Sequence, residues 1–137
     1  MIVLDTNVPS ETSKSEPDPN VMRWLDLHDD QLWLPTIALA ELRYGVEKLA
    51  ASRQRTRLDA WLTAQADRYL TRTLPFDAQA AEAHGRLRAR LKLIGKPMDA
   101  PDSYIAAIAL SRGAPVATRN ASRFAHAGVE LINPWEP

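Results

Sequence analysis

Short apolar runs alternate with longer stretches of helical hydrophobic spacing along the whole chain. The first run, Ile2–Leu4, stops at the polar Asp5 and predicts a buried strand that ends in a polar turn. The same criteria predict further strands at residues 32–35, 70–76, 116–118 and 129–132, and helices at residues 21–28, 36–49, 52–68, 78–93 and 99–112. This alternation favours an α/β fold, in which helices cover both faces of a parallel sheet.

Several helix ends carry local signals. Thr36 and Asp99 are predicted N-caps, because their side-chain oxygens can accept hydrogen bonds from the first free backbone N–H groups. Gly95 and Gly113 follow the last periodic residue of their helices, the position at which glycine commonly ends a helix.

Length and composition limit the kind of protein. The 137 residues fit a single domain spanning residues 1–137, and 17 basic residues balance 17 acidic ones, so any nucleic-acid contact must be local. The lack of cysteine excludes disulfides, thiolate ligands and a cysteine nucleophile. There is neither a signal-peptide pattern nor an apolar run of about 20 residues, so we expect a cytoplasmic protein without membrane contact.

Three acids stand where free carboxylates are unusual. Asp5 directly follows a predicted buried strand, and active sites of open α/β sheets lie beyond the carboxyl ends of the strands. The alternative is that Asp5 caps a following helical turn. Glu41 interrupts an apolar run and has no cation three or four residues away, so it needs a distant partner, either a site or a structural arginine.

Asp99 and Asp102 lie at the start of the alanine-rich helix predicted at residues 99–112, where acids favourably meet the helix dipole. With Asp99 as the cap, Asp102 falls on the same stripe as Ile105, Ala106 and Ala109, the face expected to meet the sheet. Asp102 is therefore a candidate for the crevice, although a purely capping role also accounts for its position.

Carboxylates on separate elements, without cysteine, suit a hard cation such as Mg²⁺ or Mn²⁺ rather than zinc. Such a site can hydrolyse a phosphodiester, because the cation orients and activates water and neutralises charge on the phosphate. The residue pattern thus points to metal-dependent phosphodiester chemistry at Asp5, Glu41 and Asp102.

Six segments together resemble the PIN-domain toxins of the VapC and FitB type, which belong to type II toxin–antitoxin pairs. The segments are residues 4–8, 39–45, 95–97, 102–107, 117–120 and 132–135. The resemblance implies a three-layer α/β fold around a five-stranded parallel sheet, a magnesium-dependent endoribonuclease activity, homodimerisation, and a cognate antitoxin that occupies the active groove. Operator DNA would be contacted only through the antitoxin.

By the resemblance, Asp5, Glu41 and Asp102 match the catalytic and metal-binding acids of the family. The auxiliary positions are the polar residues expected around the same crevice, with Asp99 as a possible extra acid: Thr6, Asn7, Asp99, Thr118 and Asn120. The chain departs from the family pattern at Arg123, where many relatives have a fourth aspartate. One negative charge fewer weakens attraction for a second cation, so a site for one Mg²⁺ is expected.

Basic residues are the candidates for RNA contact. Arg119 and Arg123 lie beside the predicted crevice and are the favoured candidates. The clusters at residues 53–57 and 86–92 are expected to be mainly solvated helix faces. A catalytically weak PIN module that acts by binding an antitoxin and operator DNA is the alternative function. A phospho-accepting receiver and a haloacid-dehalogenase phosphatase fit poorly, because Asn7 stands where the latter requires a second aspartate.

Overall fold

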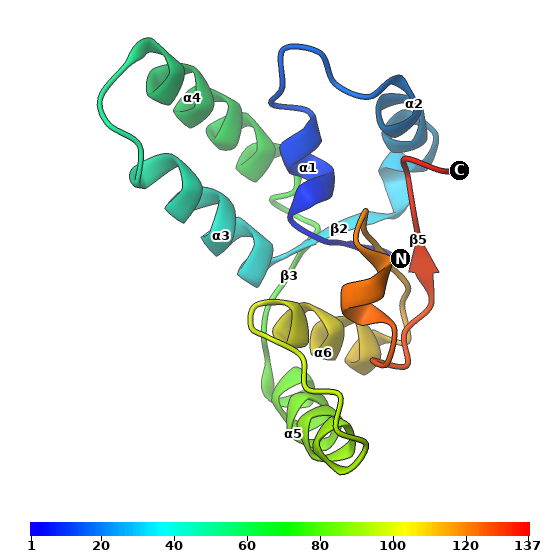
Figure 1. Ribbon diagram of the computed structural model, residues 1–137. Coiled ribbons are helices and arrows are strands. Elements are labelled where there is room, and N and C mark those ends of the chain that lie inside the picture. The colour runs from blue at the N-terminus through cyan, green and yellow to red at the C-terminus, as the bar shows by residue number, and fades with distance from the viewer.

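A computed structural model describes all residues, 1–137 (Figure 1). Its centre is a five-stranded parallel sheet in the order β3-β2-β1-β4-β5. The strands are β1 (Ile2–Leu4), β2 (Leu32–Pro35), β3 (Thr73–Leu74), β4 (Val116–Ala117) and β5 (Leu131–Ile132). The first strand of the chain is the central one, in register with Trp33 of β2 and Val116 of β4 through Val3. The predicted α/β fold with a parallel sheet is confirmed.

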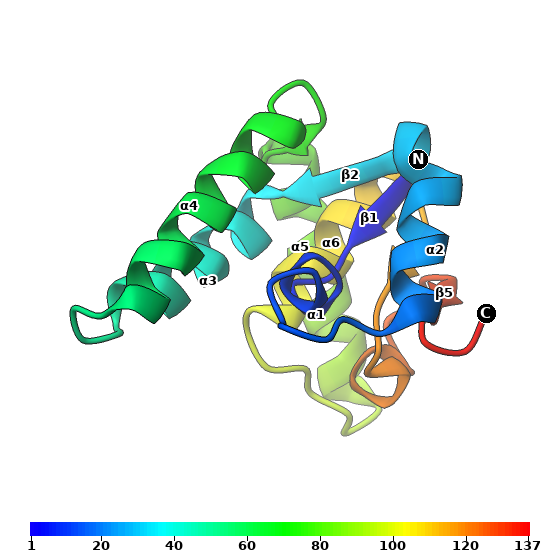
Figure 2. The same cartoon turned by 90° about the horizontal axis from the view of Figure 1, so that it is seen from above.

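Helices connect the strands and cover both faces of the sheet. They are α1 (Asn7–Glu11), α2 (Pro19–His28), α3 (Thr36–Glu47), α4 (Arg53–Arg68), α5 (Ala78–Leu93) and α6 (Asp102–Arg112), with short 3-10 turns η1 (Asp29–Gln31) and η2 (Ala121–Phe124). In Figure 2, β1 and β2 run side by side between α2 and α6. None of the helices combines the length and the apolar character that crossing a membrane requires.

The strand pleat divides the core into two clusters. Val3 points to the face that α5 and α6 cover, whereas Ile2 and Leu4 point to the face that α1, α2 and α3 cover, as the period of two requires. Helices α3 and α4 project together to one side of the sheet (Figure 1) and share a small apolar cluster of Leu42, Val46 and Leu62. The site-bearing ends of β1 and β4 therefore lie inside a packed framework.

Helix α6 meets the sheet through its small residues, as predicted. Ile105, Ala106 and Ala109 are fully buried and lie in the same core cluster as Val3. Gly113 follows the helix with a φ of 60°, the left-handed conformation that an added Cβ would strain. Close packing of these small side chains brings the first turn of α6 near the end of β1.

Some predicted boundaries were wrong. Helix α6 begins at Asp102 and not at Asp99, because Pro101 disfavours helical conformation in the residue before it. Thr36 is the first residue of α3 and not its cap, since the extended Pro35 precedes it directly. The strand predicted at residues 70–76 shrinks to β3, because residues 70–72 form a turn.

Candidate active site

Asp5 lies at the carboxyl end of the central strand and is almost completely buried, with 2% exposure. Its Oδ1 accepts a hydrogen bond from the backbone N–H of Thr6 (2.8 Å), and its Oδ2 accepts one from the hydroxyl of Thr118 (2.7 Å). Neither bond caps α1, whose N-cap is Thr6. The side chain of Asp5 is thus held in place by neighbouring elements, β4 included, and the capping alternative is not observed.

Glu41 extends from α3 and is half-buried. Its Oε1 accepts a hydrogen bond from the hydroxyl of Thr6, and no arginine forms an ion pair with it, so the distant structural arginine is not observed. Burial raises the pKa of Glu41, and the negative charges of Asp5 and Asp102 raise it further, against the lowering effects of Thr6 and Arg123. Glu41 therefore lies close enough to Asp5 and Asp102 for their charges to act on it.

Asp102 is the first residue of α6 and is buried, with 8% exposure. Its carboxylate accepts no hydrogen bond from the N-terminal N–H groups of the helix, so the capping role is not filled. Burial raises its pKa, and the nearby charges of Asp5 and Asp99 act in the same direction, while Arg123 lowers it. Asp99 itself is exposed in the loop before α6.

Arg123 reaches from η2 to two of the acids. Its Nη2 lies 3.4 Å from Oδ2 of Asp5, and its Nε lies 3.5 Å from Oδ2 of Asp102. The side chain of Arg123 is half exposed, whereas both carboxylates are buried. The sequence assigned Arg123 to RNA and did not predict these contacts. A signal was present in the sequence, because the resemblance implied an acid at the position that Arg123 occupies.

The auxiliary polar residues lie around Asp5. Thr118 is fully buried and also accepts a hydrogen bond from the backbone N–H of Asn120 (3.0 Å), whose own side chain is exposed. Oδ1 of Asn7 accepts a bond from the backbone N–H of Arg119 (3.5 Å), while its Nδ2 is buried without any partner. Buried polar atoms are nearly always paired, so the unpaired Nδ2 of Asn7 is an exception among the polar residues around Asp5.

The donor set fits a hard divalent cation. At the carboxyl edge of the sheet, burial and the negative charge of Asp5 both raise the pKa values of Glu41 and Asp102, so a cation would relieve the repulsion among the three carboxylates. They do not form a closed group of ligands, since no three acids or histidines lie close enough to hold a metal as they stand. Arg123 lies between two of them.

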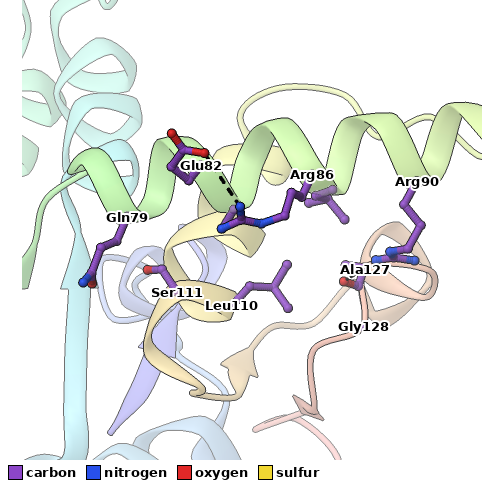
Figure 3. Close-up of a pocket in the computed structure, with 10 residues that line it drawn as sticks. Gln79, Glu82, Arg86, Arg90, Leu110, Ser111, Ala127 and Gly128 are labelled. Carbon is purple, nitrogen blue, oxygen red and sulfur yellow. Dashed lines mark hydrogen bonds and ion pairs between the residues drawn. The ribbon is translucent and has the colours of Figure 1, made fainter.

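Most of the predicted basic clusters are engaged in structural contacts. Figure 3 shows a hollow of about 750 Å³ between α5, α6 and the segment before β5, away from the acids. On its wall, Arg90 donates to the backbone carbonyls of His126 (2.9 Å) and Ala127 (2.8 Å), and Arg86 pairs with Glu82 (3.7 Å). Arg90 therefore ties α5 to the segment before β5, whereas Arg86 takes part only in an exposed ion pair within α5.

Two other basic residues of α5 face a different hollow. Arg88 and Lys92 form no ion pair and line a space of about 480 Å³ beside the loop at residues 95–98. The same loop borders the hollow of about 340 Å³ that contains Asp102 and Arg123. The guanidinium of Arg119 stacks on Trp135, 5.3 Å from the ring centre.

The fold and these residues define an α/β protein with an acidic site at the carboxyl edge of its sheet. Residues 2–130 match the family model described as "PIN domain", and the chain belongs to this family. It is 45% identical to the VapC ribonuclease Y4jK of Sinorhizobium fredii, over 100% of this chain and 99% of that one.

Solved structures agree with this membership. The crystal structure of FitAcB from Neisseria gonorrhoeae superposes with a TM-score of 0.92 at 37% identity, covering 100% of both chains. VapBC-5 from Mycobacterium tuberculosis, a member of the VapBC family of toxin–antitoxin systems, gives a TM-score of 0.70 at 33% identity over 96% of each chain. The resemblance found in the sequence motifs is confirmed.

Proposed function

We propose that this protein is the toxin of a toxin–antitoxin pair and a Mg²⁺-dependent endoribonuclease that hydrolyses RNA phosphodiester bonds. The convergence of Asp5, Glu41 and Asp102, from β1, α3 and α6, at one edge of the sheet carries the proposal. The ribonuclease named among its relatives, at 45% identity over the full length, supports the same activity.

The three acids would hold one Mg²⁺, for which Mn²⁺ can substitute. When bound, the cation supplies charge that stabilises the developing negative charge on the phosphate and lowers the pKa of the attacking water. Asp5 is oriented for this role by its two hydrogen bonds, from Thr6 and Thr118. Glu41 is oriented in the same way, by the hydrogen bond that it accepts from the hydroxyl of Thr6.

The RNA backbone would cross the acids between two basic areas. Arg88 and Lys92 line a hollow that shares residues 95, 97 and 98 with the hollow containing Asp102, and the backbone N–H of Arg119 bonds Asn7, two residues after Asp5. Each is exposed and forms no ion pair, so each can neutralise a phosphate. This arrangement satisfies the requirement that a chain with balanced charge binds RNA locally.

The test is cleavage of structured RNAs by the purified protein, freed of antitoxin. Mg²⁺ should permit cleavage and a chelator should stop it, and Asp5→Asn should lower the rate by about two orders of magnitude or more. Asp67→Asn is the matched control, because Asp67 is exposed and forms no ion pair, and it should cleave like the wild type. Equal cleavage in all samples would refute metal-dependent catalysis by these acids.

An alternative function is favoured by one observation: the acids do not form a ready metal group, and Arg123 stands between two of them. In this case the protein would act as a weak or inactive module that binds an antitoxin and, through it, operator DNA. A hollow of about 420 Å³ between α1, α3 and α4, lined by Tyr44, Leu58 and Trp61 and bordered by Glu41, suits an apolar segment of such a partner. Tight antitoxin binding without cleavage of any RNA would support the alternative function as a binding module.

Homodimerisation is part of both proposed functions.

A further inference from the structure

The contact between Arg123 and two buried acids has no counterpart elsewhere in the molecule. All other ion pairs join side chains away from the site, whereas Arg123 is the one cation paired with Asp5 or Asp102. Two carboxylates buried at one sheet edge need a positive charge, because burial makes unpaired charge costly. In the protein without a metal, the guanidinium supplies that charge.

The same contact is loose. Distances of 3.4 and 3.5 Å exceed the roughly 2.7–2.9 Å of a strong charge-assisted hydrogen bond, and the two N–H groups of Arg123 go to different acids instead of forming a fork on one. The side chain is half exposed and belongs to the short turn η2, so it can leave without disturbing the core. Only the neighbouring Phe124 anchors this turn in the core.

The oxygens that Arg123 contacts are those that a cation would use. Oδ1 of Asp5 accepts the Thr6 N–H, and its Oδ2 is shared between the Thr118 hydroxyl and Arg123. Mg²⁺ requires oxygens at about 2.0–2.1 Å, much closer than a guanidinium lies. A cation held by Oδ2 of Asp5 and Oδ2 of Asp102 would therefore compete with Arg123 for the same two oxygens and repel its charge.

We propose that the guanidinium of Arg123 competes with a divalent metal for the carboxylates of Asp5 and Asp102. The proposal rests on the metal site proposed above and adds a residue that sets its affinity. Metal binding is then an exchange, in which the guanidinium leaves the carboxylates and becomes free to face the phosphate. In the metal-free protein, Arg123 acts by neutralising and holding the two carboxylates and takes no part in catalysis.

Mn²⁺ titration by calorimetry on the full chain tests the exchange without any RNA. Arg123→Gln removes the competitor and should bind Mn²⁺ at least about fivefold tighter than the wild type, because the repulsion of one nearby charge is lost. Arg86→Gln removes the same charge from an exposed i,i+4 pair outside the site and should leave the dissociation constant within about twofold. Equal or weaker binding by Arg123→Gln would overturn the proposal.

Thermal unfolding provides a second readout with the opposite sign. In a chelator, Arg123→Gln should melt below the wild type, because Asp5 and Asp102 lose their only cation. Saturating Mn²⁺ should raise its melting temperature more than that of the wild type. A variant that melts lower in a chelator and gains no more from Mn²⁺ than the wild type has lost a structural contact only, which would overturn the competition.

A third measurement uses the unaltered protein. The Nε–H resonance of Arg123 should shift and exchange faster with solvent when Mg²⁺ is added, and an unchanged resonance in Mg²⁺-bound protein would refute displacement. Failure of the two proposals is distinguishable. If neither wild type nor Arg123→Gln binds Mn²⁺, the metal-dependent function itself fails. If both bind it equally and RNA is cleaved, only the competition fails.

Discussion

The hydrogen bond from Thr118 to Asp5 joins the residues that directly follow β4 and β1, and it should stabilise the protein more than an ordinary hydrogen bond. It spans 113 positions of the sequence, measures 2.7 Å and lies in a fully buried setting. Hydrogen bonds to charged groups contribute about 1.5–3 kcal/mol. Thr118→Val keeps the shape and removes the hydroxyl, so we expect the free energy of unfolding without metal to fall by about 2 kcal/mol.

The assay is urea unfolding at pH 7 in a chelator, followed by tryptophan fluorescence. Thr63→Val is the matched control, since Thr63 is exposed and its hydroxyl bonds only the carbonyl of Asp59 within α4 (3.1 Å). This control should change the free energy of unfolding by less than about 0.5 kcal/mol.

The double-mutant cycle with Asp5 isolates the contribution of charge. In an Asp5→Asn background the bond is neutral, so Thr118→Val should cost only about 1 kcal/mol. An equal cost in both backgrounds, or a cost in the wild type no larger than that of Thr63→Val, would refute the view that the hydroxyl stabilises a buried carboxylate.

Three further predictions concern other parts of the chain. Because burial raises the pKa of Glu41 above 4.5, the metal-free protein should lose stability as the pH rises through that region. Glu41→Gln should therefore be more stable than the wild type at pH 7 in urea unfolding, and equal unfolding curves would contradict the shift. Arg90→Met should lower the free energy of unfolding by about 2 kcal/mol, because two hydrogen bonds to backbone carbonyls are lost. Arg86→Met is the control and should leave the free energy of unfolding unchanged. Equal effects of the two substitutions in urea unfolding would exclude a structural role of Arg90. Gly113→Ala, at a φ of 60°, should lower the free energy of unfolding by about 1 kcal/mol, whereas Gly85→Ala inside α5 should raise it by about the same amount. A rise in both, measured by urea unfolding, would contradict the left-handed conformation of Gly113.

The acids could be predicted because each conflicts with its own local sequence. Asp5 ends an apolar strand, Glu41 interrupts an apolar helix face, and Asp102 lies on the stripe of α6 that meets the sheet. Strand alternation then predicts that the carboxyl ends gather at one edge. The fold class followed from the same periodicity, since a parallel sheet needs helical crossovers.

The remaining details of the structure leave no periodic pattern in the sequence from which they could be predicted. The two residues of β3 are too few to show alternation, and Pro101 moved the start of α6 by three residues from Asp99. Contacts between distant side chains, such as that of Thr6 with Glu41 and that of Arg123 with Asp5, depend on how elements pack in three dimensions. Residue types indicated the site, and packing decided which of its charges are paired.

The position of β1 at the middle of the sheet has a consequence during synthesis. The strand is made first, but its partner β4 and the buried Thr118 arrive more than one hundred residues later. Closing so long a loop is entropically costly and is repaid only when both strands are present. A growing chain therefore contains Asp5 long before it contains the Thr118 hydroxyl that holds one of its carboxylate oxygens, so the site at the edge of the sheet is complete only after β4 and Thr118 have been made.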